Sequence, residues 1–179
     1  MRALPTQLSG PLLIEPLVRG DERGFFLESY RANAMQTLGV AGELVQHNHS
    51  RSRRGVVRGM HFQPGMGKLV RCLRGAIFDV VVDIRPGSET FGRWEGFELD
   101  DIAHHELWCP DGFAHGFCVR SEVADVAYAC TAYHDPAADF GFRFDDPEVA
   151  ISWPNDLELI ASQRDRTAPS LAEIAASLH

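Results

Sequence analysis

The sequence predicts an all-β fold of the sandwich or jelly-roll type. From Val45 onward, short runs rich in β-branched and aromatic residues follow one another, each bounded by Gly, Pro or Asp. Within residues 77–84 apolar side chains recur at every second position, which is the period of a strand. Helical spacing is confined to two short segments. This distribution favours packed antiparallel sheets over strands that alternate with helices.

The N-terminal part is expected to supply two short strands and one helix. The apolar run Leu12–Val18 ends at the turn signal Arg19-Gly20-Asp21, and we expect it to form an edge strand or a strand exchanged with another subunit. A second short strand is expected around the two phenylalanines that follow. Residues 31–38 are predicted to form a helix, because their apolar side chains share one face and Gly39 is a typical helix stop.

The remainder is predicted to be strands followed by a terminal helix. Ser170 and Glu173 form a capping-box pattern, and apolar residues follow at helical spacing up to Leu178. Because no repeat, low-complexity tract or linker divides the chain, residues 1–179 are expected to form a single domain. The expected strands span residues 68–74, 76–84, 94–99, 106–109, 116–119 and 123–131.

Composition limits the class of protein. The 179 residues include 25 Asp and Glu against 17 Lys and Arg, a formal net charge of −8. Proteins that bind nucleic acids or anionic membranes usually present net basic surfaces, so neither partner is expected. The four cysteines form no CxxC pair and are expected to be reduced and buried. With no apolar run of membrane-spanning length and no signal-like N-terminal segment, we expect a soluble, cytoplasmic protein.

One stretch departs from this acidic balance. Residues 44–78 contain no Asp or Glu but seven basic residues. They include Arg58-Gly59-Met60-His61-Phe62-Gln63, which places a titratable imidazole beside fixed positive charge. A solvated basic face would show the same clustering, but the motifs that follow favour a site for a small anionic ligand.

A second motif, Pro110-Asp111-Gly112-Phe113-Ala114-His115-Gly116-Phe117, resembles the second signature of the cupin barrels, whose His points into the barrel mouth. The first cupin signature supplies further metal ligands, whereas the corresponding place here offers only His61-Phe62-Gln63. A catalytic divalent metal needs about three protein ligands, so no metal site is expected. Taken alone, His115 would be interpreted as a hydrogen-bonded core histidine.

Six short motifs carry a more specific resemblance, which is collinear from about Ile14 to Asp165. They are Gln46–Ser50, Arg58–Gln63, Lys68–Cys72, Asp79–Arg85, Gly112–Phe117 and Ser162–Arg166. Each is weak alone, but in this order and spacing they resemble the dTDP-4-dehydrorhamnose 3,5-epimerase family. The resemblance implies a cupin jelly roll without metal or other cofactor, usually a homodimer, acting on a nucleotide-linked 4-keto-6-deoxyhexose in deoxysugar biosynthesis.

The chemistry of that reaction accounts for the residue types. Epimerisation beside a ketone needs a base to remove the proton next to the C4 carbonyl, a cation to stabilise the enolate oxygen, and an acid on the opposite face. A histidine suits the base because its unperturbed pKa of about 6.5 lies near working pH, and a carboxylate partner fixes its tautomer. The resemblance makes His61 the base and Asp165 its partner, Tyr128 the acid and Lys68 the cation. Without it, each would be interpreted as an ordinary core or surface residue.

The resemblance also implies a set of substrate contacts, among which arginines suit paired contacts with a pyrophosphate. Arg23 and Glu28 are expected to serve the neighbouring subunit's site, since the N-terminal part is often exchanged across the dimer in this family. The residues expected to contact nucleotide, pyrophosphate or sugar are Arg23, Glu28, Gln46, Asn48, Arg58, His115, His134, Asp139 and Arg164.

The sequence departs from the family pattern where the nucleotide is expected. His134 follows Tyr133 at the place where the family commonly has the tyrosine that stacks on thymine. This departure leaves the nucleotide preference and the outcome at C5 open. The main hypothesis is an epimerase that inverts C3 and C5. The alternatives are a C3-only mono-epimerase, a nucleotide-sugar ketoisomerase and, with less support, a metal-dependent cupin oxygenase or a non-catalytic binding module.

Overall fold

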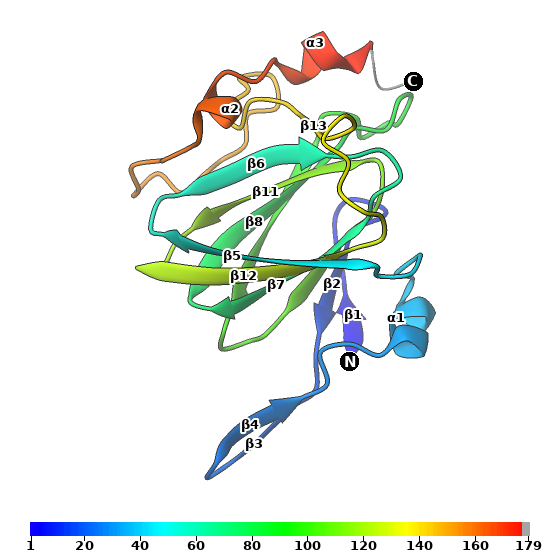
Figure 1. Cartoon of the computed structure of the whole chain (residues 1–179), viewed down its shortest axis with the longest axis vertical. Coiled ribbons are helices and arrows are strands. Elements are labelled where there is room, and N and C mark those ends of the chain that lie inside the picture. Colours follow the sequence, from blue (N-terminus) through cyan, green and yellow to red (C-terminus); the bar gives the residue numbers. More distant parts are fainter. Residues whose placement is uncertain (177–179) are drawn as a thin grey trace.

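The computed structural model describes residues 1–176, in which two large antiparallel sheets pack face to face and a third, two-stranded sheet projects from them (Figure 1). The strands of the two large sheets are Arg2–Leu4 (β1), Leu12–Glu15 (β2), Gln46–Arg53 (β5), Val57–Phe62 (β6), Lys68–Arg74 (β7), Ala76–Asp83 (β8), Trp94–Asp100 (β9), Glu106–Cys109 (β10), Phe113–Val119 (β11), Val123–Cys130 (β12) and Phe140–Gly141 (β13). The first sheet has the order β1-β2-β10-β7-β12-β5, and the second has the order β13-β6-β11-β8-β9.

The strand pairing is that of a jelly roll. β5 pairs with β12, β6 with β11, β7 with β10 and β8 with β9, all antiparallel. These are the pairs of one long hairpin that has been rolled up, so that alternate pairs fall into opposite sheets. The cupin jelly roll predicted from the sequence is therefore confirmed.

The alternation in β8 separates two buried faces. Ile77 and Val81 belong to the core between the sheets, whereas Val80 and Val82 belong to a second core on the outer side of their sheet. Asp79 is completely buried and accepts a hydrogen bond rather than facing solvent. The C-terminal segment covers the outer core, to which it contributes Leu171 and Ile174.

The short helices lie at the periphery. α1 (Ala32–Leu38) packs against the first sheet and ends at Gly39, whose φ of 105° is left-handed, as the stop signal predicted. α3 (Leu171–Ala175) begins with the predicted capping box. α2 (Gln163–Arg166) was not expected, because four residues are too few to show helical periodicity. Leu178 lies outside the described residues.

The N-terminal strands differ from expectation in two places. β3 (Val18–Asp21) and β4 (Gly24–Leu27) form a hairpin that projects from the sandwich (Figure 1), so Arg19-Gly20-Asp21 is strand and the turn follows it. β2 lies between β1 and β10 and is not an edge strand. All four cysteines are buried and free, as predicted. No helix in the described part of the chain is long and apolar enough to cross a membrane.

Candidate active site

Two cavities that share part of their lining lie within the jelly roll. Their volumes are about 490 and 380 Å³, and both are lined by His61, Lys68, Tyr128 and Arg164. His61 comes from β6 in one sheet, whereas Lys68 and Tyr128 come from β7 and β12 in the other. The predicted base therefore meets the predicted cation and acid across the space between the sheets.

Most of the predicted site residues line these two cavities. Arg23 and Glu28 do not: Arg23 lies in the turn of the β3–β4 hairpin and pairs with Asp21, and Glu28 pairs with Arg31. In addition to the four shared residues, the larger cavity is lined by Arg58, His115 and Asp165, and the smaller one by Gln46, Asn48, His134 and Asp139.

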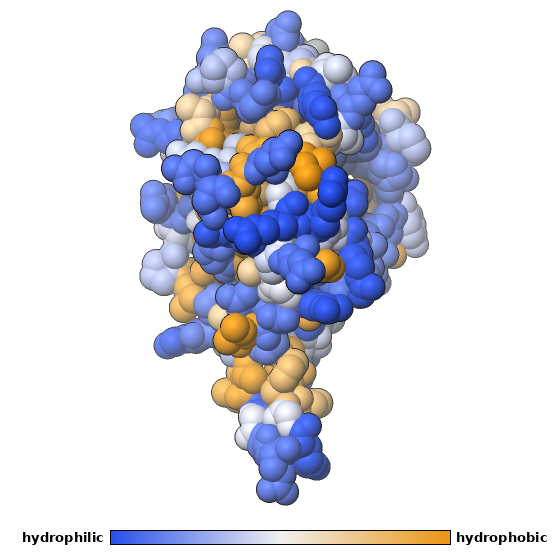
Figure 2. Space-filling view, turned by 90° about the vertical axis from the view of Figure 1, so that its left-hand side faces the viewer, coloured by the Kyte–Doolittle hydropathy of each residue, from blue (hydrophilic) through white to orange (hydrophobic). Residues whose placement is uncertain are grey.

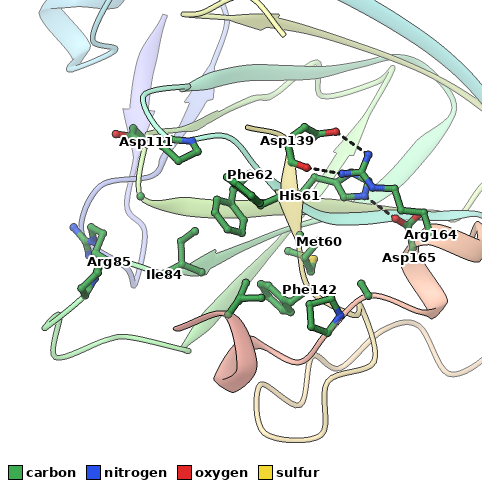
Figure 3. Close-up of a pocket in the computed structure, with 18 of the residues that line it drawn as sticks. Met60, His61, Phe62, Ile84, Arg85, Asp111, Asp139, Phe142, Arg164 and Asp165 are labelled. Atoms are coloured by element: carbon green, nitrogen blue, oxygen red, sulfur yellow. Dashed lines mark hydrogen bonds and ion pairs between the residues drawn. The ribbon is translucent and has the colours of Figure 1, made fainter. Parts of the chain in front are cut away.

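His61 and Asp165 form a hydrogen-bonded pair in which His61 Nε2 lies 2.6 Å from Asp165 Oδ1 (Figure 3). Burial works to raise the pKa of Asp165, but hydrogen bonds from His61, Ser162 and the Gly59 backbone outweigh it and hold the pKa below its ordinary value. Asp165 is therefore ionised near neutral pH and can only accept hydrogen bonds. The hydrogen bond to Asp165 therefore uses a proton on His61 Nε2. This tautomer leaves His61 Nδ1 as the basic nitrogen.

An irregularity in β6 directs the side chains of two predicted site residues into the same cavity. Arg58 and His61 are three residues apart, a spacing that puts side chains on opposite faces of a regular strand. Opposite them, Phe117 pairs with Arg58 and His115 with His61, so β6 holds one extra residue, as in a bulge. The extra residue restores both side chains to the cavity. Gly59 permits the close approach, because a Cβ there would lie 2.6 Å from Gly116 Cα.

Lys68 and Tyr128, the predicted cation and acid, line the same two cavities as His61. Lys68 Nζ donates to the backbone carbonyl of His61 at 3.3 Å, which keeps the ammonium group beside the base. Burial raises the pKa of the Tyr128 phenol, so the group stays protonated at neutral pH. The protonated phenol and the His61 imidazole therefore line the same cavities from opposite sheets.

A second histidine–carboxylate pair lies deeper in the fold. His115 Nε2 is 2.7 Å from Asp79 Oδ1, and both side chains are buried. His115 also lines the larger cavity, so it is more than a core residue. Asp79 was not predicted as a site residue. The signal that could have identified Asp79 is an acid with apolar residues on both sides within a predicted strand. A buried acid in such a place needs a buried hydrogen-bond partner.

Side-chain amides hold the loop that follows β12. Gln63 donates to the backbone oxygen of Tyr133 at 3.0 Å and accepts from the backbone N–H of Asp135 at 2.9 Å. Gln46 accepts from the backbone N–H of His134 at 2.8 Å. Tyr133 is 72% exposed, whereas His134 lines the smaller cavity. Gln46 therefore supports the loop, a role that the sequence did not indicate.

The basic stretch forms an anion site only in part. Of its seven basic residues, Lys68 lines both cavities and Arg58 lines the larger one. Arg51 instead pairs with Asp125 at 2.8 Å, and Arg71 lies 3.7 Å from Glu106. Alternation along the strands explains the division, because it sends every second side chain to the outer face of the sheet.

A third cavity, of about 880 Å³, borders the His61–Asp165 pair (Figure 3). Its lining is largely apolar and includes Met60, Phe62 and Phe142. The charged groups at its rim are already paired: Arg164 donates to Asp139 at 2.7 Å, and His61 is bound to Asp165. Within residues 1–176, no three His, Cys, Asp or Glu side chains lie close enough together to hold a metal ion.

Comparison with known proteins identifies the family. The model of the dTDP-4-dehydrorhamnose 3,5-epimerase family matches residues 5–173. The chain belongs to this family. It is 46% identical over 178 residues to the dTDP-4-dehydrorhamnose 3,5-epimerase of Escherichia coli, covering 97% of this chain and 96% of that protein. It is 45% identical over 177 residues to a dTDP-4-dehydrorhamnose 3-epimerase of Streptomyces niveus, covering 97% and 85%.

A solved epimerase structure is similar along nearly its whole length. It is the dTDP-6-deoxy-D-glucose-3,5-epimerase of Legionella pneumophila in complex with dTDP-4-keto-L-rhamnose. The two chains are 46% identical, with a TM-score of 0.95 over 99% of this chain and 96% of that one. The family assignment and the jelly roll therefore agree.

Proposed function

We infer that this protein is an epimerase of a nucleotide-linked 4-keto-6-deoxyhexose, converting dTDP-4-dehydro-6-deoxyglucose to dTDP-4-dehydrorhamnose by inversion at C3 and C5. The observation that carries the inference is the His61–Asp165 pair, which lines the larger cavity together with Lys68 and Tyr128. A binding module has no need for a base, an acid and a cation in one cavity. No cofactor enters the chemistry that we propose.

Each of the cavity side chains has a role in moving the proton or in stabilising the charge that its removal creates. His61 Nδ1 takes the proton from the carbon next to C4, and the electrons of that bond move to the C4 oxygen. Lys68 stabilises the resulting enolate, and His115 adds a hydrogen bond in the same region. The enolate then collapses while Tyr128 delivers its proton to the opposite face of that carbon. His61 ends protonated and Tyr128 deprotonated, and exchange with solvent resets both.

A single substitution distinguishes the enzyme from a binding module. His61→Ala is expected to lower turnover of the 4-keto sugar by about 10²–10⁴-fold, because it removes the general base. Binding of dTDP, measured by calorimetry, should stay within about threefold of wild type, since the base contacts the sugar. His47→Ala is the matched control, because His47 is exposed on β5 and lines neither catalytic cavity. Unchanged turnover by His61→Ala would refute the proposed mechanism.

Inversion at C3 alone is the second candidate, and the loop after β12 favours it. Tyr133 is 72% exposed and lines neither cavity, whereas the smaller imidazole of His134, which is also exposed, lines the smaller cavity. A smaller aromatic surface binds a nucleotide base less tightly. The sugar is then less firmly positioned and can bind with only one of C3 and C5 within reach of the base. A C3-only relative is about as similar to this chain as the 3,5-epimerases are. Deuterium labelling at C3 and C5 during turnover in heavy water separates the two.

We propose further that the protein works as a homodimer. Within residues 1–176 the β3–β4 hairpin forms no strand pairing outside itself, and Leu17, Phe25 and Phe26 are 58%, 60% and 71% exposed. Figure 2 shows this apolar base below the body, with a hydrophilic tip beyond it. An isolated two-stranded ribbon is marginally stable in water, so a second copy that covers the apolar base would stabilise it. The tip would then bring Arg23, with Glu28 nearby, to the partner's cavity.

Light scattering on the purified protein tests this assembly. We expect a dimer for wild type and a shift toward monomer for Phe26→Lys, because the lysine charge would be buried in the contact. A wild-type monomer at micromolar concentration would contradict the proposal. We also propose that residues 1–179 form one domain and that the protein is cytoplasmic, where a reducing milieu suits four free cysteines.

A further inference from the structure

The cavity-facing side of β5 carries four polar side chains, and one differs from the others. Gln46 donates to Asn48 at 3.1 Å, and Asn48 donates to Cys130 Sγ at 3.6 Å. Ser52 accepts a hydrogen bond from Arg58 Nε at 3.0 Å. The hydroxyl oxygen of Ser50 is buried and has no hydrogen-bond partner in the described part of the chain. Buried hydroxyls are nearly always paired, so this one calls for a partner from outside the protein.

Ser50 lies where a substrate would supply that partner. It lines the larger cavity together with His61, Lys68 and Tyr128. In the β5–β12 ladder Ser50 is opposite Val126, and Asn48 is opposite Tyr128. Ser50 and Tyr128 are therefore diagonal neighbours on one face, a relation that places side chains about 7–8 Å apart. A six-membered ring held between Tyr128 and His61 brings a ring substituent within hydrogen-bonding reach of Ser50.

We propose that Ser50 binds the 2-hydroxyl of the hexose and makes the cavity selective for sugars that carry this group. The proposal rests on the function inferred above. A 4-keto-6-deoxyhexose linked through C1 has free hydroxyls only at C2 and C3. The 3-hydroxyl changes direction when C3 is inverted, and the C4 oxygen belongs to Lys68. The 2-hydroxyl keeps its position throughout, so a fixed serine on a rigid strand can bind it in every state.

The test compares two substrates that differ at one atom: dTDP-4-keto-6-deoxyglucose and its 2-deoxy counterpart. Ser50→Ala should lower kcat/KM for the parent by about three- to tenfold, the worth of one neutral hydrogen bond, and for the 2-deoxy sugar by less than about twofold. The melting temperature should not fall, because the hydroxyl makes no bond within the described protein. Ser50→Cys, which keeps the size and weakens the donor, should give the same order of effects.

Ser52→Ala is the matched control on the same strand. It frees Arg58, which is expected to contact the pyrophosphate region common to both substrates, so kcat/KM should fall equally for the two sugars. A loss for Ser50→Ala that is equal for both sugars, or absent for both, would overturn the assignment while leaving the epimerase intact. If the wild type fails to process the parent sugar, the proposed function is refuted, and the role of Ser50 is refuted with it.

Discussion

Replacing Asp165 with Asn isolates the contribution of the carboxylate to the base. The side chain keeps its size and stays buried, and the amide oxygen can still accept from the Gly59 backbone. The amide nitrogen then faces His61 Nε2, where the carboxylate oxygen lay 2.6 Å away. An N–H donor there selects the tautomer with the proton on Nδ1. The nitrogen that should remove the substrate's proton is then blocked.

The expected loss follows from the two effects. A hydrogen bond to a charged group is worth about 1.5–3 kcal/mol, which alone corresponds to about ten- to hundredfold in rate. The inverted tautomer brings the loss toward the full value of a general base, about 10²–10⁴-fold. We therefore expect kcat for Asp165→Asn to fall by about 10²–10⁴-fold while KM changes little, since Asp165 acts through His61.

Steady-state kinetics of the 4-keto sugar, with product isomers followed by NMR, measure this change. Asp139→Asn is the matched control: its carboxylate also lines a catalytic cavity but pairs with Arg164, so the substitution should raise KM and leave kcat nearly unchanged. A fall in kcat of less than about threefold for Asp165→Asn would contradict the dyad. A large rise in KM with kcat intact would reassign Asp165 to substrate binding.

Three further predictions follow from the structure. Tyr128→Phe should lower kcat by about 10²–10⁴-fold with KM within about threefold, as steady-state kinetics will show; an unaffected kcat would assign proton return to another group. Burial raises the pKa of Glu106 in the folded protein from 4.5 to about 7. As pH rises above about 4.5, the unfolded chain therefore loses this proton while the folded protein keeps it. The free energy of unfolding should fall by about 3 kcal/mol by pH 7 as a result. Glu106→Gln should therefore melt at a higher temperature than wild type at pH 8 but not at pH 5; parallel melting curves would contradict this. Mixing Arg23→Ala with His61→Ala subunits should restore about a quarter of wild-type activity if Arg23 acts on the partner's site, whereas no recovery would place Arg23 in its own subunit's site.

The sequence predicted those elements whose signals are local. Residues 68–74 and 106–109 are strands with the predicted bounds, and Gly39 ends α1 as expected. A stop residue, a run of apolar residues or a capping box acts within a few positions, so one chain segment suffices to identify it. The turn of the β3–β4 hairpin was misplaced because a glycine is only a local turn signal. Gly20 also tolerates an extended backbone, which it adopts in β3.

What the sequence could not give were relations between distant segments. Asp79 and His115 are 36 positions apart, and Gln63 reaches the loop at Tyr133 across 70. Neither spacing has a periodicity that would indicate the contact. The bulge that turns Arg58 and His61 to the same side depends on pairing with β11, which only the folded sheet defines. The family resemblance supplied the candidate site residues, and the fold shows which of them line the same cavities.

The measurement that tests the central claim most directly is solvent exchange during turnover. The protein would be incubated with dTDP-4-keto-6-deoxyglucose in heavy water, and deuterium at C3 and C5 followed by NMR. Inversion at both carbons predicts deuterium at both, since each returned proton comes from a group that exchanges with solvent. Deuterium at C3 alone would make the protein a C3 epimerase and point to Tyr133 and His134. If neither carbon exchanges, the roles given to His61 and Tyr128 are contradicted.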